Sequence, residues 1–323
     1  MSKNNNQIPT NVLKTLVKVI IFVLVAVMIH RTLSNSYDEF QQAEFDLQQV
    51  QVEYLFLSII LYACGLICFA FVWHLALQIL GQHPTKTESL GSYFISQLGK
   101  YVPGKALVVI IRSERIRSKR TALSPAIVAV FIETLGMMAV GAILAGVLLV
   151  CSGYRSTDPQ LIIICLGLAL MAGIPSAPPV FRAIIRSLTK NRVKGDLVNQ
   201  VDNLTLSTMI PCWIVSAVGW VLLGASLYAC LYSLPNSIML SPIGISQLGL
   251  IIASVALAIV TGFVSLVPGG AGVREYIMLT LLTANFGIVA SSLAAILMRV
   301  IWLLSEVLFA AFFYILMKRS TPL

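Results

Sequence analysis

Long apolar runs constrain this 323-residue chain more than any other feature. A helix of about 20 apolar residues crosses the roughly 30 Å hydrocarbon core of a bilayer. With 58% hydrophobic and 11% charged residues, the composition excludes an ordinary soluble domain. We therefore predict an all-α polytopic membrane protein with about six spanning helices. The runs long enough to span are 14–33, 53–80, 122–151, 159–178, 206–233 and 287–317.

Basic residues near the ends of these runs predict the orientation of the chain. The run 14–33 follows a polar N-terminus and has no small-residue cleavage site, so we expect it to remain as an anchor. With the N-terminus in the cytoplasm, most of the 22 Lys and Arg residues lie inside, and the C-terminus is cytoplasmic as well. The basic residues that fall in spanning or broken segments, where charge is costly and usually functional, are Lys100, Lys105, Arg274 and Arg299.

Two further apolar segments, 91–111 and 244–286, are interrupted by Pro-Gly. The loops on both sides of 91–111 are basic, so this segment enters from the cytoplasm, turns at Pro103-Gly104 and returns. The loop 234–243 contains no Lys or Arg, so 244–286 enters and leaves on the outer side, although its first limb is long enough to span. We predict two re-entrant hairpins of opposite sense.

The two turns share a local sequence, VPGKA at 102–106 and VPGGA at 267–271. Together with the opposite entry sides, this match favours an inverted repeat with the substrate site between the halves. The chain is then one membrane domain, 1–323, with halves 14–151 and 159–317. The cytoplasmic basic linker 179–205 is either a solvated connection or, as its mixture of apolar and basic residues favours, a helix on an anionic leaflet.

The segment GKYVPGKA at 99–106 fits the first seven positions of a nucleotide-binding P-loop. A P-loop also needs a Ser or Thr after the lysine, and Ala106 occupies that position. The six cysteines form no CxxC pair and the three histidines are scattered. Because no nucleophile has a base within plausible reach, we predict no enzyme, no catalytic residue, no metal and no cofactor.

The turns provide candidate anion-binding groups. Lys105 opens the second limb of its hairpin, beside the unpaired N–H groups of a helix N-terminus. In the second hairpin, glycines allow close approach of a ligand and Arg274 can donate two hydrogen bonds to a phosphate, unless it pairs with Glu275 to lock the turn. Glu133 stands 30 residues after Pro103, and Arg299 stands 31 residues after Pro268.

This spacing places Glu133 and Arg299 in corresponding positions of the two halves. They pair with each other, form structural ion pairs, or serve a substrate or proton, and Glu306 lies on the same helix face as Arg299. The candidate substrate-binding residues are Lys100, Tyr101, Pro103, Gly104, Lys105, Arg112, Glu133, Pro268, Gly269, Gly270, Gly272, Arg274, Glu275, Arg299 and Glu306.

These segments carry a resemblance. GKYVPGKALVVIIRSERIR, the FIETLG helix and SLVPGGAGVREYIMLTLL, with Arg299 downstream, resemble the membrane domain of lysylphosphatidylglycerol synthases, a flippase-like family that includes stand-alone members. The resemblance covers nearly the whole chain. Only ILMKRSTPL follows Tyr314, so we expect neither the aminoacyl-transferase domain nor lysyl transfer. Family members often carry Glu-Arg in the third spanning helix, whereas Thr134 follows Glu133 here.

The resemblance implies movement of a phospholipid or lipid-linked anionic head group between leaflets, with the two hairpins lining the path. We therefore expect a lipid flippase or scramblase in a bacterial or archaeal cytoplasmic membrane. Its partners would be membrane lipids, either anionic phospholipids or polyprenyl-phosphate-linked substrates, and no nucleic acid. The alternatives are a secondary transporter of a small anion and a non-transporting partner of a glycosyltransferase or polysaccharide enzyme; a homo-oligomer stays open.

Overall fold

The computed structural model describes residues 47–101, 106–152, 159–189, 196–241, 243–265 and 267–320. Within these ranges the chain is helical and contains no β-strand. The all-α prediction is therefore confirmed. The predicted first span 14–33 and the turn residues Pro103, Gly104 and Lys105 lie outside the described residues.

Five described helices are long and apolar enough to cross a membrane. They are α3 (Val52–Ile79), α6 (Leu123–Cys151), α10 (Leu206–Tyr232), α11 (Leu248–Val264) with the short η4 (Ile245–Gln247) before it, and α13 (Ile288–Ser320). A sixth span is formed if α7 (Pro159–Ser176) and α8 (Pro178–Thr189), which are bent by 62° relative to each other, are counted together. These elements confirm an integral membrane protein and coincide with the runs predicted to start at 53, 122, 159, 206 and 287.

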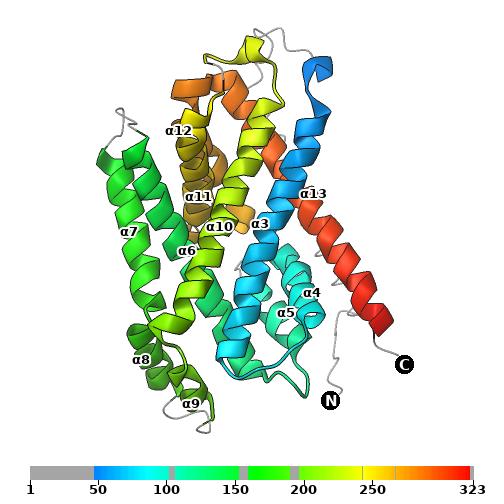
Figure 1. The fold of residues 1–323 in the computed structure, drawn as a ribbon, viewed down its shortest axis with the longest axis vertical. Helices are drawn as coiled ribbons and strands as arrows, with labels where there is room; N and C mark the ends of the chain where they lie inside the picture. The colour runs from blue at the N-terminus through cyan, green and yellow to red at the C-terminus, as the bar shows by residue number, and fades with distance from the viewer. Residues whose placement is uncertain are drawn as a thin grey trace, which may run out of the picture.

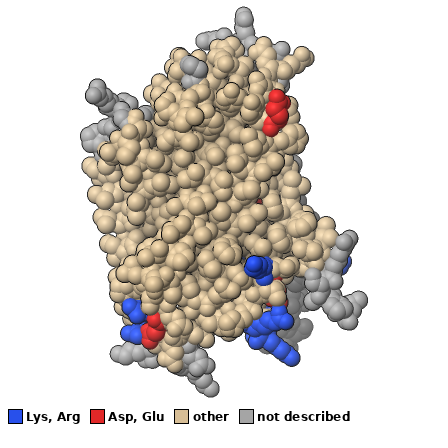
Figure 2. All heavy atoms as spheres, viewed as in Figure 1, with Lys and Arg blue, Asp and Glu red and all other residues tan. Residues whose placement is uncertain are grey.

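The surface has the charge distribution of a membrane-embedded bundle. On the face shown in Figure 2, Lys and Arg atoms lie in the lower part, an acidic group lies near the upper end, and the wide belt between them carries neither. Such a belt suits hydrocarbon, because a charged side chain in the bilayer centre is costly. The sidedness of the two ends stays a prediction.

Local sequence signals explain where several helices begin. Thr85 and Glu88 form a capping box, in which the Thr85 hydroxyl accepts from the Glu88 amide and the Glu88 carboxylate accepts from the Thr85 amide. Pro178 starts α8 where the missing N–H costs least, and the chain bends there relative to α7. The other short helices are η1 (Leu47–Gln49), α9 (Asp196–Asp202) and η3 (Asn236–Ile238).

The first Pro-Gly segment forms a helical hairpin whose ends meet. Its first limb is α4 (Lys86–Gln97) followed by the 3-10 helix η2 (Leu98–Tyr101), and its second limb is α5 (Ala106–Ile116), which packs against α4. At the base, the His83 amide donates to the Arg120 carbonyl at 3.2 Å. The Ala122 amide donates to the Gln82 side chain at 2.8 Å. The chain therefore leaves and returns at one place.

The second Pro-Gly segment forms a corresponding hairpin. It consists of α11, the 3-10 helix η5 (Pro268–Gly270) and α12 (Val273–Phe286), which packs back along α11. At its base the Leu240 amide donates to the Phe286 carbonyl at 3.4 Å, and the Ser241 hydroxyl donates to the Asn285 carbonyl at 2.6 Å. As anticipated from its length, α11 alone can span a membrane.

The tips of the two hairpins touch. A Cβ atom added to Gly269 would lie 3.0 Å from the Tyr101 ring, and Gly269 has φ +59°, so both the close approach and the backbone conformation favour glycine. In Figure 1, α4 and α5 occupy the lower half of the bundle and α12 the upper half. The two hairpins also pack in corresponding ways. The first limb of each contacts the last helix of the other predicted half: α4 contacts α13, and α11 contacts α6. The second limb of each contacts the last helix of its own predicted half: α5 contacts α6, and α12 contacts α13. Re-entry from opposite sides and an inverted repeat would produce this arrangement, and both stay predictions.

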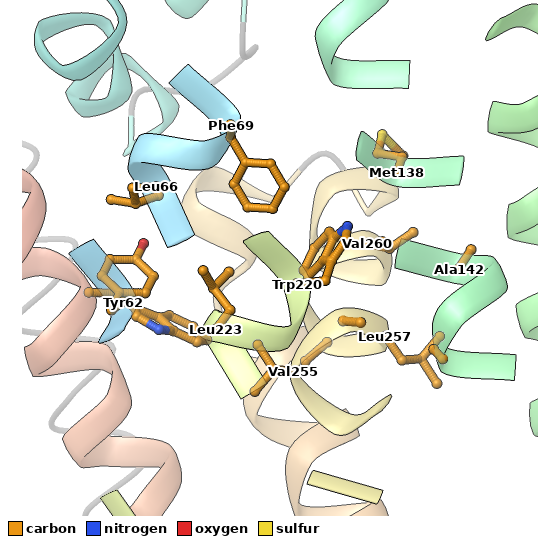
Figure 3. Close-up of a cluster of buried hydrophobic side chains, with 14 of the residues drawn as sticks. Tyr62, Leu66, Phe69, Met138, Ala142, Trp220, Leu223, Val255, Leu257 and Val260 are labelled. Carbon is orange, nitrogen blue, oxygen red and sulfur yellow. The ribbon is translucent and has the colours of Figure 1, made fainter. Parts of the chain in front are cut away.

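The core beside the hairpin tips is tightly packed by small residues. The helices α3 and α10 lie against each other, where a Cβ on Gly65 would clash with Leu223 and one on Gly219 would lie 3.0 Å from the Phe69 ring. Small residues let membrane helices approach closely, and the buried hydroxyls of Ser58 and Ser226, 2.9 Å apart, join the same pair. Figure 3 shows the neighbouring cluster, in which Trp220 of α10 faces α3, α6 and α11.

Candidate functional site

A cavity of about 250 Å³ lies beside the hairpin tips, bounded by α3, α4, α5, α6, α10, α11, α12 and the tip elements η2 and η5. Most of its lining is apolar, and Figure 3 shows several of these residues: Tyr62, Leu66, Phe69, Trp220 and Leu223. Its charged lining consists of Lys100, Arg112, Glu133 and Arg274. The backbone of η5 contributes Gly269 and Gly270. The cavity is therefore mainly apolar, and its described wall carries three basic side chains and one acidic side chain.

Arg112 and Glu133 form a buried ion pair on this wall. The Arg112 Nη1 and Glu133 Oε2 atoms are 2.8 Å apart, and each side chain is only 3% exposed. Arg112 also donates from Nε to the Ser96 hydroxyl at 3.0 Å, and its guanidinium lies 4.2 Å from the centre of the Tyr93 ring. The basic partner that the sequence lacks after Glu133 is therefore supplied by α5 instead of α6.

Glu275 and Arg299 form a second buried pair, between α12 and α13. Arg299 also donates to the carbonyls of Gly269 at 2.8 Å and Gly270 at 3.0 Å, so it fixes the backbone of the turn. This geometry settles two open alternatives. Glu133 and Arg299 do not pair with each other, and Glu275 does not pair with Arg274.

Glu306 accepts hydrogen bonds from three groups on two other elements. Lys100 of η2 forms an ion pair with it, the Tyr62 hydroxyl of α3 donates at 2.6 Å, and the Tyr101 hydroxyl of η2 donates at 3.1 Å. The Glu306 side chain is fully buried, whereas Lys100 is 19% exposed and lines the cavity. The cluster therefore joins the tip of the first hairpin to α13.

Arg274 differs from the other cations on the wall. The residue is only 9% exposed, yet no carboxylate among the described residues pairs with it, and its Nε has no hydrogen-bond partner there. It lies in a slot made by glycines: a Cβ on Gly262 or Gly270 would come within 2.7 Å of its side chain. Its guanidinium lies 5.4 Å from the centre of the Trp302 ring.

The charge balance of the site is positive. Its described cations are Lys100, Arg112, Arg274 and Arg299, and its described carboxylates are Glu133, Glu275 and Glu306. A buried charge without a partner is costly, so this excess favours an added anion. Arg274, the cation without a described carboxylate partner, lies on the cavity wall.

The structure brings most of the predicted site residues together. Lys100, Arg112, Glu133, Gly269, Gly270 and Arg274 line the cavity. A second group binds these lining residues or their neighbours from behind the wall: Tyr101, Glu275, Arg299 and Glu306. The turn of the second hairpin contains Pro268 and Gly272. Pro103, Gly104 and Lys105 lie outside the described residues.

Sequence reasoning missed the aromatic partners of these charges. Tyr62 binds Glu306, and Tyr93 contacts Arg112. The centre of the Trp302 ring lies 5.4 Å from the Arg274 guanidinium and 5.5 Å from that of Arg299. The available signal was weak, because each is one aromatic residue in a largely apolar or mixed helix. Only the hydroxyl groups of Tyr62 and Tyr93, placed within predicted membrane segments, distinguished them from lipid-facing aromatics.

Comparison with known proteins agrees with a membrane domain. The family described as the lysylphosphatidylglycerol synthase TM region matches residues 15–310, which is nearly the whole chain. A comparison with curated proteins found no match. The matched region contains both hairpins and every charged residue of the cavity wall. The chain belongs to the lysylphosphatidylglycerol synthase transmembrane family, whose members are membrane domains of the flippase-like type.

Proposed function

We propose that this protein binds a lipid through an anionic, phosphate-containing head group in the cavity and moves it between leaflets. The observation that carries the proposal is Arg274, a buried cation on the cavity wall without a described carboxylate partner. Arginine presents several N–H donors in a planar arrangement that matches phosphate, and binding there would neutralise the excess charge of the site.

The apolar lining favours a lipid over a small soluble anion. Phe131 of α6 lines the cavity and is 47% exposed. In our proposal the cavity opens toward the bilayer at this residue, where the acyl chains would leave it. A head group near Arg274 could keep its chains over this apolar side. Small-molecule sites commonly combine an apolar lining with a few placed polar groups, as this one does.

Nucleotide hydrolysis does not drive this movement in our proposal. The P-loop-like segment 99–106 begins inside the 3-10 helix η2, directly after α4, where a P-loop would need a preceding strand. Ala106 also provides no hydroxyl for a magnesium ion. Movement would then be downhill or coupled to an ion gradient.

The test is transbilayer movement of labelled lipids in liposomes that contain the purified protein. Anionic phospholipid, zwitterionic phospholipid and polyprenyl-phosphate lipid are compared in wild type, Arg274→Gln and the control Arg117→Gln. The control removes an exposed arginine that lies outside the cavity. We expect movement of an anionic or polyprenyl-phosphate lipid, at least tenfold slower in Arg274→Gln and unchanged in the control.

Three outcomes contradict the proposal. Equal rates in wild type and Arg274→Gln would remove Arg274 from the path. Uptake of a soluble anion without lipid movement would favour the secondary-transporter alternative. No movement of any lipid by folded protein would favour the role of a non-transporting partner.

A further inference from the structure

We propose that Lys100 is shared between Glu306 and the head group, so that an anion in the cavity takes the ammonium from Glu306 and weakens the attachment of the first hairpin tip to α13. This inference rests on the proposed function and deepens it. It assigns Lys100 to head-group binding and Glu306 to competition with the substrate.

The exposures of the two partners support this assignment. Lys100 lines the cavity and is 19% exposed, whereas Glu306 is fully buried behind it and does not line the cavity. An anion that enters can therefore reach the ammonium while Glu306 holds it from the other side. Arg274 lines the same cavity and offers the second cation for such an anion.

Glu306 can lose Lys100 without losing all its hydrogen bonds. The hydroxyls of Tyr62 and Tyr101 also donate to it, at 2.6 Å and 3.1 Å. A carboxylate accepts several hydrogen bonds, so these two donors remain when the ammonium turns away. The lysine has three donors on a flexible stem, which allows it to change partners at small geometric cost.

The other cavity-lining cation of the first hairpin, among the described residues, lacks this freedom. The Arg112 guanidinium lies 4.2 Å from the Tyr93 ring and 5.4 Å from the Trp73 ring, with Ser96 and Glu133 as hydrogen-bond partners. Four contacts hold it in one position. Of these two cations, Lys100 is therefore the one that can change partners when a substrate binds.

The weakening would be specific to one hairpin. The helix α13 holds the first tip through Glu306 and the second tip through Arg299, which binds Glu275 and the carbonyls of Gly269 and Gly270. An anion that competes for Lys100 removes the ion pair of the first tip, leaves the Tyr101 hydroxyl bound to Glu306, and does not touch the contacts of the second tip. Head-group binding would thus loosen the contact between the halves at the hairpin tips.

The test is binding of a water-soluble anionic phospholipid, short-chain phosphatidylglycerol, to purified protein by titration calorimetry. Short-chain phosphatidylcholine and inorganic phosphate are titrated in parallel, to separate head-group charge from free phosphate. Removing the competing carboxylate in Glu306→Gln should tighten phosphatidylglycerol binding about tenfold, because more of the protein then has Lys100 available. Lys100→Gln should weaken it about tenfold, and the control Glu114→Gln, an exposed carboxylate outside the cavity, should leave it unchanged.

A charge exchange, Lys100→Glu with Glu306→Lys, separates competition from a structural role. The exchanged pair keeps its mutual attraction but places a carboxylate on the cavity wall, so we expect at least a tenfold loss of phosphatidylglycerol binding in protein with wild-type thermal stability. Recovery of wild-type binding in this variant, or weaker binding in Glu306→Gln, would overturn the inference. If folded wild-type protein binds none of the probes, the proposed function fails together with it. If inorganic phosphate binds and neither phospholipid does, the site takes a free anion, and the assignment of a lipid head group is wrong.

Discussion

The buried pair of Arg112 and Glu133 gives the sharpest stability prediction. Replacing Glu133 by Leu leaves the Arg112 charge, 3% exposed, without its carboxylate, and breaking one side of a buried pair costs about 3–5 kcal/mol. The cation–π contacts of Arg112 with Tyr93 and Trp73 remain, and they are each worth about 0.5–2 kcal/mol, so we expect the lower part of that range. Equilibrium unfolding of purified protein, followed by tryptophan fluorescence, measures the loss directly.

The double variant Arg112→Met with Glu133→Leu should recover most of that stability, because replacing a whole buried pair by apolar residues is often neutral. The double variant should still move lipid more slowly than wild type, since it removes Arg112 from the cavity wall. The exposed pair Arg117 and Glu114, 3.7 Å apart, is the control, and removing it should cost less than about 1 kcal/mol. The reasoning would be refuted if Glu133→Leu lowered the free energy of unfolding by less than about 1 kcal/mol. It would also be refuted if the loss in the double variant equalled the sum of the losses in the two single variants.

Two further predictions concern the second hairpin tip. Gly270→Ala should lower the stability of the folded protein by about 1–3 kcal/mol and slow lipid movement, because Gly270 has φ +68° and a Cβ would lie 2.7 Å from Arg274 Nε. Thermal unfolding checks this, with Gly167→Ala as the control, because a Cβ added there meets no atom within 4 Å. Arg299→Lys should keep the ion pair but lose one of the two carbonyl contacts at Gly269 and Gly270, so faster proteolysis of this turn than in wild type is expected, and equal rates would contradict it.

The spanning helices were predictable because the bilayer thickness fixes a required length of apolar sequence. The run 206–233, for example, became α10 at Leu206–Tyr232. The basic loops on both sides of 91–111 led us to predict that the chain returns there, and His83 and Arg120 meet at the base of this segment. Its re-entry into the membrane stays a prediction. Boundary signals such as Pro178 act locally and are therefore visible in the sequence.

The partners of the buried charges were not predictable from spacing. Glu133 and Arg299 occupy corresponding places after their turns, which left open a pair between them. Each instead binds the second limb of its own hairpin, because the limb and the following helix are in contact along their length. The Lys100 and Glu306 pair joins residues 206 positions apart, and only the meeting of η2 with α13 brings them together.

The three ion pairs divide into two kinds, and this division bears on how the protein would move. Arg112 with Glu133 and Glu275 with Arg299 each join a hairpin to the last helix of its own predicted half, with the positions of acid and base exchanged. Lys100 with Glu306 joins the predicted halves, and it alone combines a cavity-lining cation with a carboxylate that has other donors. Breaking the first kind leaves a buried charge without compensation, whereas an anionic head group can replace Glu306 at Lys100. We therefore expect the Lys100 and Glu306 pair to be the one that opens, while each hairpin keeps its ion pair with the last helix of its own predicted half.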